Sequence, residues 1–189
     1  MTRGPLGRRV SLPFLMHRSR DRLVAAARFS EEARRFIDWA DGSASPQKLS
    51  AAVALRRVVA LYAAALALPQ PWSEGVSIAS AAEPALAERL QVVRTRAAAF
   101  ALQHYSEIFS PLVQPLEPPV VGDLADDLVD IYRDVATGLC LYEAGGIDDA
   151  LWQWGFRFQT HWGEHASSAI RALHCYLAKE DPSGLSGEV

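Results

Sequence analysis

Two adjoining stretches decide the fold: residues 123–142, DLADDLVDIYRDVATGLCLY, and residues 148–177, DDALWQWGFRFQTHWGEHASSAIRALHCYL. In each stretch apolar residues recur every three or four positions, the spacing that places them on one face of an α-helix. Each stretch opens on an aspartate, which is a good N-cap, and Gly145-Gly146 between them ends the first helix. Because a short connection makes neighbouring helices antiparallel, we expect the two helices to form a long antiparallel hairpin.

The chain before this pair predicts three more helices, over residues 30–40, 46–68 and 84–109. Ser30 is a good N-cap for the first of them, and Ser45 with Pro46 forms the N-cap and first position of the second. Four prolines then exclude regular structure as far as Gly122. No strand pattern appears, so we predict an all-α fold, a single-domain bundle of about five helices.

The bulk composition is that of an ordinary soluble protein of one domain. The chain has 189 residues, of which 50% are hydrophobic, and its 19 Lys+Arg against 22 Asp+Glu give a formal charge of -3. This near-neutral average excludes a strongly basic nucleic-acid binder. A chain of this length also buries a continuous core without needing disulfides or a structural metal.

The charge is unevenly distributed along the chain. Residues 1–28 contain seven arginines and one aspartate, which gives +6, so the remainder carries -3 minus +6, or -9. We expect residues 1–28 to be a basic, disordered N-terminal arm, 29–178 the helical domain, and 179–189 a disordered C-terminal tail. Nucleic acid would bind only through the basic arm. The alternative is that the arm is a leader outside the native protein.

No segment predicts a membrane span or a secretory signal. The longest apolar run, residues 49–68, carries Arg56 and Arg57 near its middle, where charges are costly in a bilayer. The two cysteines, Cys140 and Cys175, show neither zinc-site spacing nor a disulfide framework,. We therefore expect a cytoplasmic protein with reduced thiols.

The antiparallel pair brings polar residues to matching levels. His161 and His165, four residues apart, share a helix face that points into the core. If the pair folds symmetrically about its two glycines, three levels match: Asp130 with His161, Asp126 with His165, and Asp134 with Arg157.

One interpretation of this group is a metal site. An H-x-x-x-H pair on a helix supplies two corners of such a site, and carboxylates from a neighbouring helix supply the others. The predicted ligands of a divalent metal, zinc or similar, are His161, His165, Asp130 and Asp127. With Asp134, the two aspartates form a row that flanks the core. A bound ion would activate water, as in a metal-dependent hydrolase.

Two other interpretations fit the same residues. Inward histidines hydrogen-bonded to Asp130, Asp127 or a tyrosine would have a purely structural role, because an unsatisfied buried polar group costs about 1–3 kcal/mol. Alternatively, the helix pair encloses a pocket for a small ligand. The predicted residues of that pocket are Trp154, Phe158 and Trp162 as walls, with Asp134 and Arg157 as polar groups.

Residues 121–134, VGDLADDLVDIYRD, and 152–165, WQWGFRFQTHWGEH, resemble the signature elements of a bacterial family catalogued only as a domain of unknown function, number five thousand and sixty-three. The resemblance covers about residues 29–177. It includes a Y-W-x-x-F-x-P element from Tyr105 to Pro111, in which Ser106 replaces the tryptophan. It implies a compact helical bacterial domain with no assigned activity, and it places the basic arm outside that domain.

The sequence leaves two classes of function open. We expect first a non-catalytic module that binds a partner protein or a small ligand, because no nucleophile–base arrangement is recognisable. Residues 106–149 hold ten acids and one base, which favours a partner with a basic surface. The alternative is a divalent-metal-dependent, hydrolase-like enzyme. Whether the protein is an enzyme therefore stays open at the level of the sequence.

Overall fold

The computed structural model describes residues 12–44, 49–70, 83–115 and 117–186. A π-helical turn, Phe158–Trp162, joins α5 to α6 without a break. When α5, the π-helical turn and α6 are counted as one long helix, the described residues form a bundle of five helices, as predicted. The helices are α1 (Leu12–Asp41), α2 (Ala51–Ala65), α3 (Glu83–Ala97), α4 (Leu124–Glu143), α5 (Ile147–Arg157) and α6 (Gly163–Glu180), and the strands are β1 (His104–Glu107) and β2 (Val120–Asp123).

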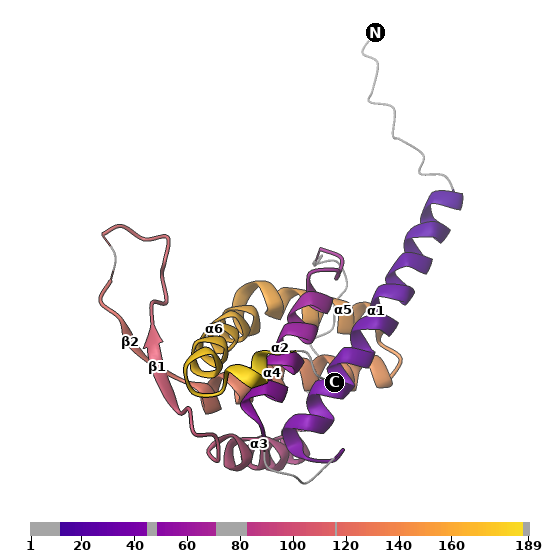
Figure 1. Cartoon of the computed structure of the whole chain (residues 1–189). Coiled ribbons are helices and arrows are strands. Elements are labelled where there is room, and N and C mark those ends of the chain that lie inside the picture. The colour runs from indigo at the N-terminus through magenta and orange to yellow at the C-terminus, as the bar shows by residue number, and fades with distance from the viewer. Residues whose placement is uncertain (1–11, 45–48, 71–82, 116, 187–189) are drawn as a thin grey trace.

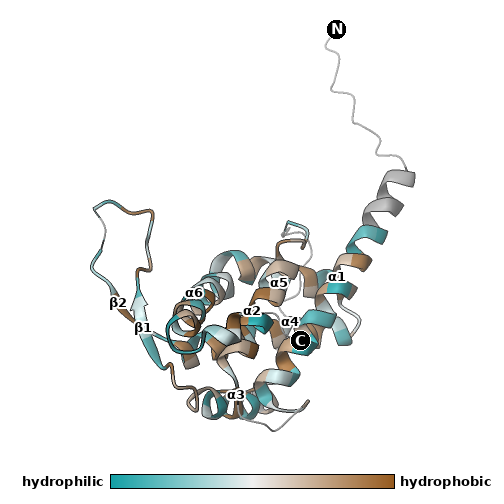
Figure 2. Cartoon of the chain, in the orientation of Figure 1, coloured by the Kyte–Doolittle hydropathy of each residue, from teal (hydrophilic) through white to brown (hydrophobic). Residues whose placement is uncertain are grey.

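Helix α4 lies at the centre of the bundle. It packs against α1, α3, α5 and α6, while α2 packs against α1 and α6 (Figure 1). A helix that is apolar on several faces must be covered on several sides. Hydrophilic residues occupy more of α1 and α3 than of α2 (Figure 2). Among the helices that the structure describes, none combines the length and the apolar character needed to cross a membrane.

The contacts between α4 and the helices α5 and α6 follow an antiparallel order. Trp154 Nε1 donates to the carbonyl oxygen of Val135 at 3.0 Å, and farther along the pair His165 faces Asp127. Residue numbers therefore rise on one helix as they fall on the other. The chain reverses at Gly145, whose φ of +86° is a conformation that glycine adopts without strain.

The helix caps agree only in part with those predicted. Asp123 caps α4 as expected, because its side chain accepts hydrogen bonds from the backbone N–H groups two and three positions on. The N-cap of α5 is Gly146, and Asp148 lies in the first turn, where the helix dipole still favours its charge,. Ser45 and Pro46 lie outside the described residues, but α2 begins at Ala51 after Ser50 as its N-cap and ends at Ala65. The predicted helix over residues 46–68 is therefore too long at both ends.

The predicted helix start at Ser30 is wrong, because α1 already begins at Leu12. Ser30 is buried and its hydroxyl donates to the carbonyl oxygen of Ala27 at 2.8 Å. Such a bond points back into the preceding turn and does not cap a helix. Ala26 and Phe29 are also buried, so the end of the expected basic arm contributes to the core. Residues 1–11 of that arm lie outside the described residues.

Helix α3 ends at Ala97, so the prediction that it continues to about Phe109 is wrong. The side-chain amide of Gln103 donates to the carbonyl oxygens of Phe100 and Ala98 at 2.6 and 3.2 Å. These bonds satisfy carbonyl groups of the turn that follows the helix. The chain then enters strand β1.

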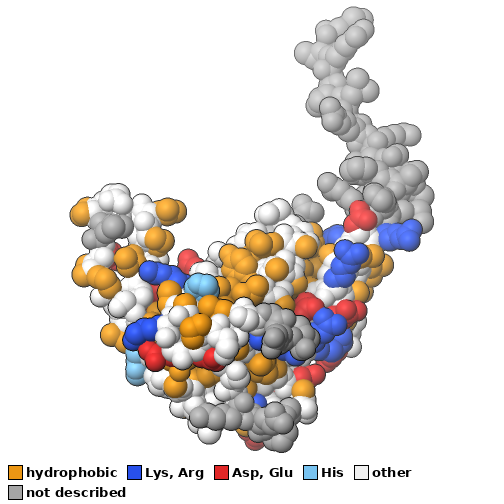
Figure 3. All heavy atoms as spheres, viewed as in Figure 1, with side chains coloured by type: hydrophobic (Ala, Val, Ile, Leu, Met, Phe, Trp, Pro, Cys, Tyr) orange, Lys and Arg blue, Asp and Glu red, His pale blue; other side chains and the backbone are white. Residues whose placement is uncertain are grey.

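Strands β1 and β2 form a β-hairpin beside α6, and the connection between the strands projects from the bundle (Figure 1). They pair antiparallel, with Tyr105 opposite Gly122, so the predicted absence of strands is wrong. Four-residue strands are too short to show alternation, and the prolines between them lie in the connection, where no ladder bond is needed. The hairpin exposes large apolar side chains (Figure 3), namely Phe109, Leu112, Val113, Val120 and Val121.

The C-terminal helix is longer than predicted. The sequence predicts a helical stretch as far as Leu177, but α6 continues to Glu180, and a 3-10 turn, Pro182–Leu185, follows within the predicted tail. Arg56 of α2 donates to the carbonyl oxygen of Gly184 at 3.3 Å. This contact and the burial of Leu177 explain why the chain stays ordered here.

Asp41 ties the end of α1 to α3 and α4. Its carboxylate is 8% exposed and accepts hydrogen bonds from Arg89 Nη2 at 2.8 Å, Tyr132 OH at 2.9 Å and Ser43 Oγ at 2.6 Å. Burial alone would raise the pKa of Asp41, but the hydrogen bonds from Ser43, Arg89 and Tyr132 outweigh it and lower that pKa. The ionised carboxylate therefore stabilises the fold.

We expect Asp41→Asn to lower the free energy of unfolding by about 1–3 kcal/mol near neutral pH, because the amide cannot match all the buried donors. The pKa of Asp41 is lower in the folded chain than in the unfolded chain. Its contribution is therefore present above the unfolded-state pKa and is lost as pH falls through the folded-state value. Urea unfolding at neutral and acidic pH measures both effects. This account would be contradicted if acidification lowered the free energy of unfolding of the parent no more than that of Asp41→Asn.

Gly138 of α4 lies against the indole of Trp154, where a Cβ would come within 2.2 Å of Nε1. Alanine normally stabilises a helix by about 0.5–1 kcal/mol relative to glycine. We nevertheless expect Gly138→Ala to destabilise the protein by about 1–3 kcal/mol, because the buried ring must move. Thermal denaturation measures whether the variant is less or more stable than the parent. A raised melting temperature would contradict the close contact between Gly138 and the Trp154 ring.

Candidate metal centre

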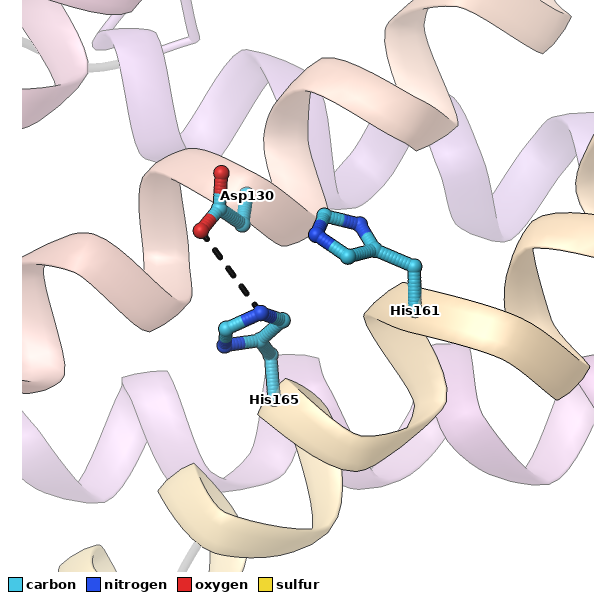
Figure 4. A group of neighbouring side chains, drawn as sticks. All are labelled: Asp130, His161 and His165. Carbon is cyan, nitrogen blue, oxygen red and sulfur yellow. Dashed lines mark ion pairs between the residues drawn. The ribbon is translucent and has the colours of Figure 1, made fainter. Parts of the chain in front are cut away.

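Helices α4 and α6 face each other with acidic and histidine side chains. Asp127, Asp130 and Asp134 come from α4, while His161 lies in the π-helical turn and His165 in the first turn of α6. Figure 4 shows both imidazole rings directed towards Asp130. The fold thus brings together all the residues that the sequence predicts as metal ligands.

Each histidine is held through Nδ1 by a buried aspartate. His161 Nδ1 lies 2.7 Å from Asp134 Oδ2, and His165 Nδ1 lies 2.9 Å from Asp127 Oδ1. The two aspartates are 4% and 5% exposed. Because an ionised carboxylate can only accept, each Nδ1 carries the hydrogen and donates. Nε2 is therefore the atom that each ring leaves for a ligand.

The burial of Asp127 and Asp134 corrects the prediction that the acidic row only flanks the core. Other helices cover α4 on several sides, so side chains beside its main apolar stripe are enclosed as well. A buried carboxylate without a partner is costly, and the histidines supply the missing donors. The hydrogen bond predicted between a histidine and Asp127 is confirmed for His165.

The facing levels differ from the predicted ones by up to one turn. Asp134, and not Asp130, bonds to His161. Asp126 was expected opposite His165 but forms an ion pair with an arginine of α3 at 2.5 Å. The π-helical turn contributes to the shift, because it inserts one extra residue into the helix. A regular 3.6-residue period does not include that insertion.

The π-helical turn requires the glycine that follows it. A Cβ at Gly163 would come within 2.2 Å of the carbonyl oxygen of Phe158, so no larger residue fits without moving the backbone. Short π-helical segments occur frequently at functional sites. The glycine within His161-Trp162-Gly163 is the sequence signal for this turn, which a regular helical period does not reveal.

Tyr105 of β1 completes the hydrogen bonding of Asp127. Its hydroxyl donates to Asp127 Oδ2 at 2.5 Å, which leaves Oδ1 for His165. The ring packs on Gly122, where a Cβ would come within 2.5 Å of it. The sequence allowed for a tyrosine here but did not identify which one, because the strand pairing that delivers Tyr105 was not predicted.

Burial and hydrogen bonding shift three pKa values at the site. Burial raises the pKa of Asp127, although the hydrogen bonds from His165 and Tyr105 act to lower it. The bond to Asp127 raises the pKa of His165 against the effect of burial. Burial and the same carboxylate raise the pKa of Tyr105, so the phenol stays protonated and donates. The hydrogen bond to Asp127 therefore favours the protonated, imidazolium form of His165.

Asp130, His161 and His165 form a group that could hold a metal ion. One ligand atom from each lies within 4.8 Å of the others, and Asp130 Oδ2 is 3.6 Å from His165 Nε2. Ligand atoms around a tetrahedral zinc lie about 3.3 Å apart, so small side-chain rotations would close the group. The three side chains are 22%, 33% and 27% exposed, which lets an ion and water reach them.

Asp127, a predicted ligand, is not in this group, because both of its oxygens already accept hydrogen bonds. It lies instead in the layer behind the ligands. Arg133 Nη1 donates to Asp130 Oδ1 at 2.5 Å. Arg157 Nε lies 3.9 Å from Asp134 Oδ1, which confirms the predicted level of that pair. The two arginines offset part of the acidic charge.

The aromatic residues predicted to wall a ligand pocket lie in the core. Trp154 and Trp162 are fully buried, and the indole N–H of Trp162 donates to the carbonyl oxygen of Trp154 at 3.3 Å. Phe158 packs against Trp162 and Tyr62, with ring centroids 4.8 and 5.0 Å apart. These rings lie on the core side of the helix that carries the histidines and anchor that helix in the core.

Comparisons with known proteins agree with this architecture. Residues 23–179 match the model of a family described as "Domain of unknown function (DUF5063)". The chain is also similar to protein BF1032 from Bacteroides fragilis, whose crystal structure superposes with a TM-score of 0.63 at 22% sequence identity, over 86% of this chain and 95% of that one. At that identity the likeness shows the fold alone. No curated protein matches the chain significantly.

Proposed function

The chain belongs to the DUF5063 family, a domain of unknown function, and we propose that it binds one divalent metal ion through Asp130, His161 and His165. Membership confirms the resemblance that the sequence predicts. Because the family description names no activity, the proposal is supported only by the geometry of the residues.

The observation that carries the proposal is the buried carboxylate behind each histidine. Metal-binding histidines usually donate their second ring nitrogen to a carboxylate or carbonyl, which fixes the tautomer and orients the ring. Asp134 and Asp127 have this relation to His161 and His165. The two rings lie with their centroids 4.9 Å apart beside Asp130. A purely structural role would readily explain one histidine–aspartate pair. It explains less readily why two such pairs have imidazole rings that face the same carboxylate, that of Asp130.

The ligand types indicate which ion would bind. Two imidazoles and one carboxylate suit zinc or ferrous iron better than magnesium or calcium, which prefer oxygen ligands. Three protein ligands leave a coordination position for water, as in catalytic zinc sites. Asp130, His161 and His165 would hold the ion, and the chemistry that it would supply is a water acidified enough to act as a nucleophile near neutral pH. The arrangement therefore supports metal-assisted hydrolysis as the reaction class to test.

Metal-free protein without an affinity tag, titrated with Zn²⁺ in a calorimeter, should bind one ion per chain. His161→Ala/His165→Ala removes two of the three ligands and should abolish this binding. Asp134→Asn keeps all three ligands but removes the carboxylate behind His161, so we expect it to weaken binding about 10- to 100-fold.

His174→Ala is the matched control, because His174 also lies on α6 but is not a member of the ligand group. Its affinity should equal that of the parent. Circular dichroism establishes that each variant is folded. Absence of stoichiometric binding by the parent, or unchanged affinity in the double variant, would contradict the proposal.

A second proposal, binding of a partner protein without catalysis, is supported by the β-hairpin. Leu112 is 94% and Val121 74% exposed, on an element that projects from the bundle (Figure 3). Exposed apolar patches often mark protein-binding sites. Residues 106–149, which include most of the hairpin, hold ten acids and one base. They favour a partner with a basic surface, whose binding weakens as salt rises.

Pull-downs and size-exclusion runs at low salt test this second proposal. A partner retained by the parent should be lost with Phe109→Ser/Leu112→Ser and kept with Leu66→Ser, which alters an equally apolar residue that is 67% exposed beyond the end of α2. Finding neither a partner nor self-association, or equal retention by both variants, would remove the proposal.

A further inference from the structure

A groove runs between strand β1 and helix α6. Its volume is about 560 Å³, and its lining includes Leu102, Tyr105, Arg171, Ala172, Tyr176 and Lys179. Sites for small molecules in proteins typically have about 300–1,000 Å³ and mostly apolar walls. The groove is separate from the three proposed metal ligands, none of which lines it.

The walls of the groove are mostly apolar. Ala172 is buried in the face of α6 that carries the groove, and Leu102 and Tyr176 are partly buried beside it. The Tyr105 ring forms the β1 side, and its hydroxyl is directed to Asp127. The body of a ligand would therefore contact carbon atoms on both sides, which favours an aromatic or branched apolar group.

Two cations lie on the α6 side of the groove. Arg171 and Lys179 are eight residues apart on one helix, so both project to the same face. Lys179 Nζ forms an ion pair with Glu180 at 3.0 Å. Arg171 is exposed, and no residue within the described parts of the chain hydrogen-bonds or forms an ion pair with it. Its guanidinium is free to bind an anion.

The charges that line the groove limit which kind of anion can bind there. Glu107 and Glu180 also line it, so two acids balance the two cations. A ligand with several negative charges, such as a phosphate ester, would be repelled by the glutamates. A single carboxylate matches the planar fork of one guanidinium and can form two parallel hydrogen bonds with it.

We propose that the groove between β1 and α6 binds a small organic monocarboxylate with an aromatic or branched apolar body. The carboxylate pairs with Arg171, and the apolar body lies between Tyr105 and Tyr176 over Ala172. This site requires no metal ion, so it stands independently of the proposed metal centre.

The probe is 3-phenylpropionate, titrated into the isotopically labelled full chain and followed by amide chemical shifts. We expect saturable shifts that cluster in β1 and α6. The neutral amide of the probe should bind at least about tenfold more weakly, and Arg171→Gln should weaken binding of the acid to a similar extent, because a charge-assisted bond is lost. Arg35→Gln is the matched control, since Arg35 is exposed on α1 and its ion pair within the described part of the chain is with its neighbour Glu32.

Three outcomes would overturn the proposal. The first is a probe that causes no saturable shifts in the parent. The second is a parent that binds the acid and its neutral amide with equal affinity, or an Arg171→Gln variant that binds the acid as tightly as the parent does. Either result would show that Arg171 does not recognise the carboxylate. The third is a stable dimer in sedimentation whose contact shifts map to the groove, which would show that a second copy covers it.

Discussion

Two buried carboxylates of the central helix constrain the rest of the structure. Asp127 and Asp134 lie in α4 where burial disfavours an unpaired charge, so each needs a donor within hydrogen-bond distance. His165 and His161 are those donors. The same contacts fix both imidazole rings at Nδ1 and direct the opposite nitrogen of each ring away from its aspartate. Satisfying the core thus pre-arranges the residues of the proposed metal centre.

The surrounding packing keeps this arrangement rigid. Trp154 and Trp162 fill the space behind the histidines, and each indole N–H donates to a backbone carbonyl. A Cβ at Gly138 would collide with the Trp154 indole, and a Cβ at Gly163 would collide with the carbonyl oxygen of Phe158. On the other side, Tyr105 links the β-hairpin to Asp127. The hairpin therefore contributes a residue to the layer behind the proposed ligands, although most of it projects from the bundle.

Much of the fold is predictable from the sequence, because the long helices have strong apolar periods and clear breaks. The histidines and aspartates of the site are predictable for the same reason, since helix spacing places them on facing elements. Their pairing is not predictable, because the π-helical turn changes the register of His161 against α4. Tyr105 is missed because its four-residue strand has no periodic signal. The start of α1 is missed because Ser30 looks like a cap and instead bonds back into its own helix.

Anomalous X-ray diffraction at the zinc edge, from crystals grown with stoichiometric Zn²⁺, tests the central claim most directly. The account predicts one strong peak about 2.0–2.2 Å from His161 Nε2, His165 Nε2 and a carboxylate oxygen of Asp130, with both Nδ1 atoms still bonded to Asp134 and Asp127. A peak bound through Nδ1, a peak only at other residues such as His174 or Cys175, or no peak at this position would contradict it.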